Sequence, residues 1–161
     1  MGKERCRALA KSLAPFSPDL IFSSFEPKAI ETAQILSKEI SLPFEAMKGL
    51  HEHDRTGVGF TEKTVFEVQI EGFFNHPNQL VFGQETAREA LERFSGALTK
   101  LEVEHPFENL IVVTHGTVIT LFVQEFNSID AFAFWKNLHL PSFVVLSRQQ
   151  HKILLVTESV T

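Results

Sequence analysis

The chain has 161 residues, 43% hydrophobic and 22% charged, which is enough apolar content to bury one core and too much for a disordered chain. Its formal net charge of -5, from 20 acidic and 15 basic residues, provides no general attraction for nucleic acid or an anionic membrane surface, so any phosphate site must be local. Cys6 is the only cysteine, which excludes an intramolecular disulfide and favours a reducing cytoplasm.

The first half of the chain predicts a helix, a strand and a second helix, followed by a loop. Apolar residues recur at spacings of three and four in residues 3–13, as on one face of a helix. Residues 19–23 predict a short buried strand, and Pro27 suits the first turn of the next helix. Residues 43–47 predict another short strand. Residues 50–64 are polar and contain two glycines, which indicates a long functional loop.

The second half predicts another unit of strand and helix. The clearest helix covers residues 87–101, with Thr86 as its N-cap. An apolar run of strand length at residues 110–114 leads into a helix at 117–126. That apolar stretch is broken by His115 and is shorter than the about 20 residues that a membrane helix needs, so no membrane contact is expected. Further short helices are predicted at residues 65–74 and 129–138, and strands at 143–147 and 152–157.

The alternation of strands and helices predicts a three-layer α/β fold in one domain, with a largely parallel central sheet and helices on both faces. Such sheets bind ligands at the carboxyl ends of their strands. Residues 23–28 and 114–117 each end a strand and begin a helix, where free backbone N–H groups bind anions well. The two junctions together predict a phosphate pocket.

Four segments carry recognisable motifs in order: SSFEPKAIETA at residues 23–33, LHEHDRTGVGF at 50–60, GQETAREALERF at 83–94 and VVTHGTVI at 112–119. The first resembles the paired-serine motif of the histidine phosphatase (phosphoglycerate mutase-like) superfamily, and the last resembles its second histidine motif. The middle two resemble its acidic loop and its Gly-x-Glu-Ser/Thr segment. Order and spacing agree with that superfamily over most of the chain.

The resemblance implies roles for five residues, with no metal or other cofactor. His115 is implied as the second histidine, which donates a hydrogen bond to a phosphoryl oxygen, and Glu52 as the acid that protonates the leaving alkoxide. Gly116 is implied to allow close backbone approach. Lys28 and Arg55 are implied to supply positive charge to the phosphate. Lys28 replaces the arginine of the family motif and lacks its planar fork, which predicts looser phosphate binding.

One part of the family pattern is not in this sequence. The family begins with an apolar strand ending in Arg-His-Gly, whose histidine becomes phosphorylated, and this sequence starts at the helix that follows. We therefore expect the domain of residues 1–161 to be N-terminally incomplete, with on the order of twenty further residues encoded upstream. Two alternatives to an incomplete chain are open. The remaining strands could close up, or a second copy of the chain could cover the exposed edge as a homodimer.

The resemblance predicts a phosphomonoester hydrolase that acts through phosphohistidine and is inactive as written, because the nucleophile is absent. The alternative is a non-catalytic or regulatory domain that binds phosphate or a phosphoester. The expected partner is a small phosphorylated substrate or free phosphate, in the cytoplasm. The cluster around Glu52, residues 51–55, is also compatible with a merely solvated loop or a chance metal site. Loop contents do not identify the substrate.

Overall fold

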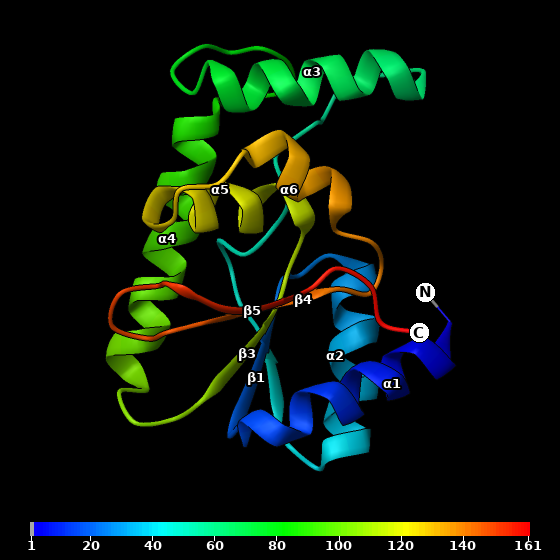
Figure 1. Ribbon diagram of the computed structural model, residues 1–161, viewed down its shortest axis with the longest axis vertical. Helices are drawn as coiled ribbons and strands as arrows, with labels where there is room; N and C mark the ends of the chain where they lie inside the picture. The colour runs from blue at the N-terminus through cyan, green and yellow to red at the C-terminus, as the bar shows by residue number, and fades with distance from the viewer. Residues whose placement is uncertain (1) are drawn as a thin grey trace.

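Helical layers cover both faces of a parallel sheet in the computed structural model, which describes residues 2–161 (Figure 1). The sheet has the order β2-β1-β3 and consists of β1 (Leu20–Ser23), β2 (Phe44–Ala46) and β3 (Leu110–Val113). Both neighbouring pairs are parallel. The predicted three-layer α/β fold with a largely parallel central sheet is thus confirmed.

The helices fall close to the ranges expected from the sequence. No helix within residues 2–161 combines the length and the apolar character needed to cross a membrane. The elements are α1 (Lys3–Leu13), the short 3-10 helix η1 (Ala14–Phe16), α2 (Pro27–Ile40), α3 (Lys63–Asn75), α4 (Ala87–Glu104), α5 (Gly116–Phe126) and α6 (Ala131–Asn137).

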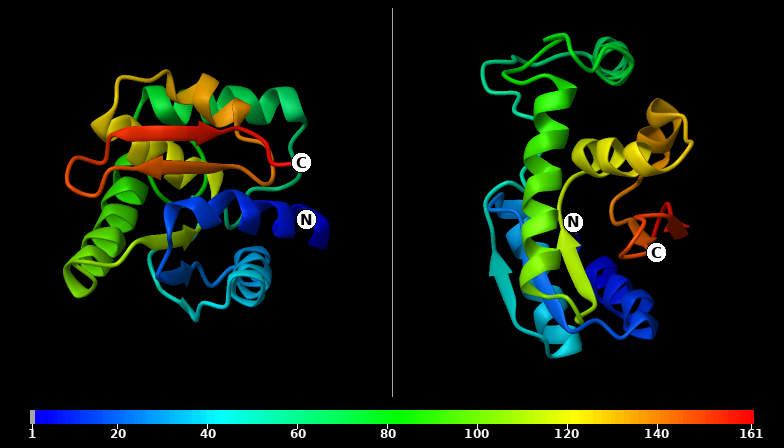
Figure 2. Two further views of the ribbon diagram at one scale, coloured as in Figure 1. Left: turned by 60° about the horizontal axis from the view of Figure 1, so that its bottom comes forward. Right: turned by 90° about the vertical axis from the view of Figure 1, so that its left-hand side faces the viewer.

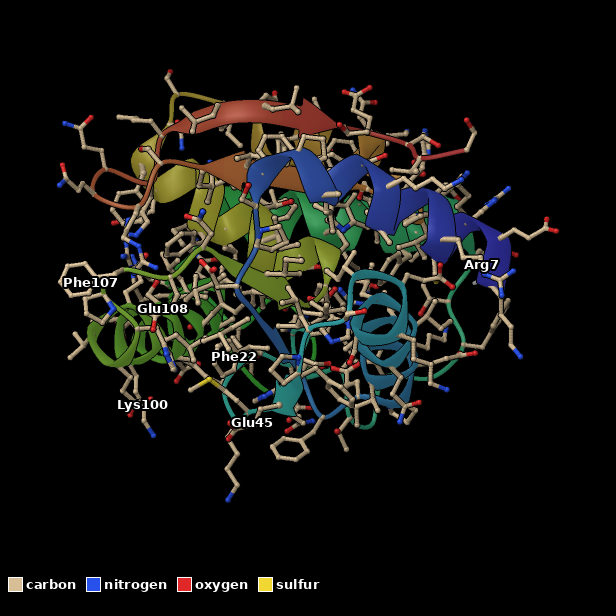
Figure 3. All side chains as sticks on the ribbon, turned by 90° about the horizontal axis from the view of Figure 1, so that it is seen from below. Arg7, Phe22, Glu45, Lys100, Phe107 and Glu108 are labelled. Carbon is tan, nitrogen blue, oxygen red and sulfur yellow. The ribbon has the colours of Figure 1, made fainter. Side chains whose placement is uncertain are left out.

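Side chains of the sheet alternate between two apolar clusters, one on each face. Phe22 and Val112 pack into the larger cluster, which α3, α4, α5 and α6 complete. Ile21 and Ile111 pack on the opposite face against α1 and α2. Figure 3 shows the buried Phe22 in the interior of the molecule. This alternation is the reason why short strands of almost wholly apolar sequence lie between two helical layers.

Helix α4 begins with a complete capping box. The Thr86 hydroxyl accepts a hydrogen bond from the Glu89 backbone N–H at 3.1 Å, and the Glu89 carboxylate accepts one from the Thr86 N–H at 2.7 Å. These hydrogen bonds lower the pKa of the Glu89 carboxyl. The predicted N-cap at Thr86 is confirmed, and it fixes the start of the longest helix.

The last two strands form a separate hairpin. Strands β4 (Phe143–Leu146) and β5 (Ile153–Thr157) pair antiparallel and lie apart from the parallel sheet (Figure 2). Within residues 2–161, β3 pairs only with β1 and β4 only with β5, so each has a free edge. Both strands line one cavity of about 1100 Å³, which we call the strand slot. The remaining strands therefore do not close up.

His53 anchors the loop between β2 and α3 in the core. Its side chain is 3% exposed and lies against the rings of Phe73 and Phe82, with ring centroids 4.3 and 4.8 Å away. One ring nitrogen, Nε2, lies 3.2 Å from the carbonyl oxygen of Glu85. Burial lowers the pKa of His53, and the nearby positive charge of Arg55 lowers it further.

Removing the cap of α4 is expected to destabilise the fold. Thr86→Ala deletes the hydroxyl acceptor for the Glu89 N–H, and we expect a loss of about 0.5 to 2 kcal/mol in the free energy of unfolding. Urea unfolding monitored by circular dichroism measures it. Thr99→Ala makes the same chemical change at an exposed position of α4 and is the control. Equal effects of the two substitutions would contradict a capping role.

Acidification is expected to weaken the fold through His53. Because its pKa in the folded chain lies below the unfolded value of 6.5, the unfolded state binds the proton first, and stability falls as the pH drops through about 6.5. The free energy of unfolding at pH 7.5, 6.5 and 5.5 should therefore depend less on pH in His53→Gln than in the wild type. His76→Gln, at an exposed position, is the control. Identical pH dependence in the wild type and His53→Gln would refute this account.

Candidate functional site

Two adjacent strand ends bring Ser24 and His115 together. Strand β1 pairs with β3 so that Ser23 lies opposite Val113, and the Ser24 N–H donates to the Val113 carbonyl at 3.0 Å. One residue beyond β1 and two residues beyond β3, the Ser24 hydroxyl lies 2.7 Å from His115 Nε2. His115 is the N-cap residue of α5, so its imidazole lies at the carboxyl end of the sheet beside a helix N-terminus.

Glu26 connects this pair to the acidic loop. Its Oε1 lies 3.5 Å from His115 Nε2 and accepts a hydrogen bond of 2.8 Å from the backbone N–H of Glu52. The Ser24 hydroxyl in turn accepts from the Glu26 N–H at 3.1 Å. The turn before α2 and the loop after β2 therefore meet beside His115.

Glu52 directs its carboxylate to the first turn of α5. The two oxygens accept hydrogen bonds from the Thr117 and Val118 backbone N–H groups at 3.1 and 3.3 Å. These N–H groups have no acceptor within their own helix, and the helix dipole favours a negative group there. The predicted acid thus lies at the helix N-terminus that directly follows His115.

Arg55 faces the same first turn. Its Nη2 donates to the Thr117 hydroxyl at 2.8 Å and lies 3.9 Å from Glu52 Oε2. The guanidinium carbon is 5.0 Å from the centre of the Phe66 ring. Burial lowers the pKa of Arg55, and the carboxylates of Glu52 and Glu26 oppose that shift. The cation is held within the fold and faces carboxylates and an aromatic ring.

All five residues that the resemblance singled out line the strand slot. Lys28 is the second residue of α2 and is exposed. Gly116 begins α5, and a Cβ added there would lie 3.7 Å from the Trp135 ring, an ordinary contact. With His115, Glu52 and Arg55, these residues border the one cavity that also follows β3 and β4. The structure therefore places all five residues at one cavity, and their roles are matters for proposal.

The histidines of the acidic loop line a different cavity from the strand slot. His51, His53 and Asp54 line a second cavity of about 500 Å³ together with Glu26 and Glu52. Burial lowers the pKa of His51, as does the charge of Arg93. Across residues 2–161, no group of three or more His, Cys, Asp or Glu side chains has the arrangement to hold a metal ion.

Sequence reasoning assigned no role to Ser24, Glu26 or Thr117, which complete the contacts around His115 and Glu52. A signal was present for Ser24, because it follows the first strand of a parallel sheet as His115 follows the third. No sequence pattern pairs Glu26 with the Glu52 backbone, since the two residues lie 26 positions apart on separate loops.

Comparison with known proteins gives consistent results. Residues 1–160 match the family model of the histidine phosphatase superfamily (branch 1). The uncharacterized phosphatase PhoE of Bacillus subtilis (strain 168) is 26% identical over 129 residues, covering 80% of this chain and 64% of PhoE. The chain therefore spans less than two thirds of that relative's length.

Two solved structures show the same fold at lower identity. Bacillus stearothermophilus YhfR has a TM-score of 0.69 at 20% identity, over 99% of this chain and 83% of its own. The alpha-ribazole phosphatase from Shigella flexneri has a TM-score of 0.66 at 18% identity, with the same coverage of 99% and 83%. Because the family model spans almost the whole sequence, this chain belongs to branch 1 of the histidine phosphatase superfamily.

Proposed function

We propose that this chain supplies the phosphate-binding and proton-donating groups of a phosphomonoester hydrolase, and that a strand in the strand slot supplies the nucleophilic histidine. The observation that carries this proposal is one cavity that is lined by His115, Glu52 and Lys28 together with residues of β3 and β4, the two strands that each have a free edge within residues 2–161.

Each group near His115 has chemistry that suits phosphoryl transfer. An incoming imidazole nitrogen attacks phosphorus, and the bond from phosphorus to the leaving oxygen breaks as Glu52 transfers a proton to that oxygen. His115 and Lys28 donate hydrogen bonds to the phosphoryl oxygens and offset their charge. Water then hydrolyses the phosphohistidine, which releases phosphate and restores the imidazole. Because Glu52 is bound to the first turn of α5, it lies close to where the leaving oxygen departs.

The strand slot supports a strand-borne nucleophile for a physical reason. The residues of β3 and β4 are apolar, yet each is only partly buried, whereas three of the four residues in β1 are buried. Each buried backbone group left without a partner costs about 1 to 3 kcal/mol. An extended segment between the two edges would pair with both and would end near His115.

The substrate is proposed as a small phosphomonoester. Similar structures include an alpha-ribazole phosphatase and a glucosyl-3-phosphoglycerate phosphatase. Both names describe an enzyme that removes a phosphoryl group, and this shared feature is the one that the proposal uses. A second candidate function is a phosphate-binding domain without catalysis, in which another copy of the chain covers the free edges. The free edges within residues 2–161 favour it, and dimerisation in analytical ultracentrifugation is the outcome that would distinguish it.

The chain of 161 residues is expected to hydrolyse 4-nitrophenyl phosphate negligibly, because His115 cannot be both nucleophile and hydrogen-bond donor. Adding the upstream codons of the natural gene, if they encode an apolar run ending in Arg-His-Gly, should produce turnover that replacement of that histidine by alanine abolishes. Release of 4-nitrophenol measures both. Robust hydrolysis by the 161-residue chain would refute the proposal and direct attention to His51, since His53 is buried in the core.

Phosphate or vanadate is expected to bind weakly near Lys28 and His115 even without turnover. Lys28→Ala removes one charge-assisted contact and should raise the dissociation constant about tenfold. Isothermal titration calorimetry at low ionic strength measures it. Lys38→Ala is the matched control, because it removes an exposed lysine from the last turn of the same helix. Binding that both substitutions leave unchanged would count against the phosphate pocket.

A further inference from the structure

Arg93 makes all of its polar contacts with the segment that leads to Glu52 and with Glu85. From the middle of α4, its Nη1 donates to the Gly49 and His51 carbonyls at 2.9 Å each, and its Nη2 donates to the Glu52 carbonyl at 3.3 Å. The same guanidinium binds the Glu85 carboxylate at 2.6 and 3.3 Å. One planar group thus holds three carbonyls within a four-residue stretch of the loop.

Glu85 extends these contacts to Asp54, two residues after Glu52 in the loop. Its Oε1, which Arg93 binds, also accepts a hydrogen bond of 3.0 Å from the Asp54 N–H. The side chains of Arg93 and Glu85 are only 20% and 15% exposed, so solvent screens their interaction less than it would at the surface. We call the pair Arg93 and Glu85 the loop clamp.

Gly49 shows how closely the loop approaches α4. Its φ of +91° lies in the left-handed region, and a Cβ there would come within 2.8 Å of the Ala97 Cβ. Only glycine fits such a position without displacing the helix or the loop. The carbonyl of Gly49 therefore lies within reach of Arg93, one turn before Ala97 on α4.

The loop clamp and Glu26 hold the backbone of Glu52 from its two sides. Its carbonyl accepts from Arg93, and its N–H donates to Glu26. With both ends of the residue held, the side chain projects toward α5 and reaches the Thr117 and Val118 N–H groups. We propose that Arg93 is a positioning residue, which sets the Glu52 carboxylate on the first turn of α5 beside His115. Its significance for catalysis rests on the proposed function, in which Glu52 is the proton donor.

The test measures hydrogen exchange at the two backbone N–H groups that donate to Glu52, and it does not require the protein to turn over a substrate. In Arg93→Leu we expect amide hydrogen exchange at Thr117 and Val118 to accelerate by roughly fivefold or more, the effect of losing one net hydrogen bond. Glu52→Ala, which removes the acceptor itself, sets the full size of the effect. The Ile119 N–H, which donates to the His115 carbonyl within α5, should keep its wild-type rate in both variants.

Arg88→Leu is the matched control, because it removes an exposed arginine from the same helix and should leave all three exchange rates unchanged. A folded Arg93→Leu with wild-type exchange at Thr117 and Val118 would overturn the proposal. Equal acceleration at Ile119 would also overturn it, since that pattern indicates a general loss of stability. Should the leucine variant not fold, Arg93→Lys keeps the charge and loses the planar fork. The same two amides must then exchange faster than in the wild type, and wild-type rates would overturn the proposal.

The result is independent of whether the chain hydrolyses a phosphoester. Failure of the proposed function would appear as absent turnover in the extended protein, with the exchange pattern intact. Failure of the positioning role would appear as unchanged exchange at Thr117 and Val118, whatever the turnover.

Discussion

In-register parallel pairing of β1 with β3 places the ends of two strands, and the helices that follow them, side by side. Because Ser23 lies opposite Val113, Ser24 comes within hydrogen-bonding distance of His115, and α2 and α5 begin at the same edge of the sheet. A shift of one residue in this register would turn each side chain to the other face. The contact between Ser24 and His115, and with it the position of Glu26, depends on that pairing.

The charges around His115 are balanced. Lys28 and Arg55 border the same cavity as Glu26 and Glu52, so a phosphate group in the proposed site would meet these two cations and these two carboxylates. Its recognition would depend on the direction of donors more than on a positive field, which agrees with the net charge of -5 for the whole chain. The first turn of α5, where the Glu52 carboxylate binds, would then have two competing anions, that carboxylate and the proposed phosphoryl group.

Local patterns were sufficient to predict the helices and strands. The apolar stripe of α4, the capping box at Thr86 and the apolar run of β3 each report on neighbours within one or two turns, where sequence spacing determines which side chains share a face. The five candidate site residues were assigned by resemblance, and the structure brings them to one cavity. Their chemical roles stay predictions.

Contacts between distant segments could not be predicted in the same way. Ser24 and His115 lie 91 positions apart, and their distance follows from strand register. Arg93 occurs in a helix whose polar face has other charged residues, so its sequence context is the same as that of a solvated arginine. Its hydrogen-bond partners become apparent only in the structure, where Gly49 approaches α4 closely. The β4-β5 hairpin is likewise separate from the parallel sheet. That separation depends on contacts between distant segments, which the spacing of neighbouring residues does not predict.

The free edges of β3 and β4 border one cavity only in the folded chain. A segment that pairs with both edges therefore binds the native state and not the unfolded one, and it adds to stability in proportion to the logarithm of its concentration. The effective concentration of a covalently attached strand is fixed by its linker. The concentration of a separate strand varies with the amount of that strand in solution. The proposed strand would thus make the melting temperature of this chain depend on the segment that occupies the strand slot.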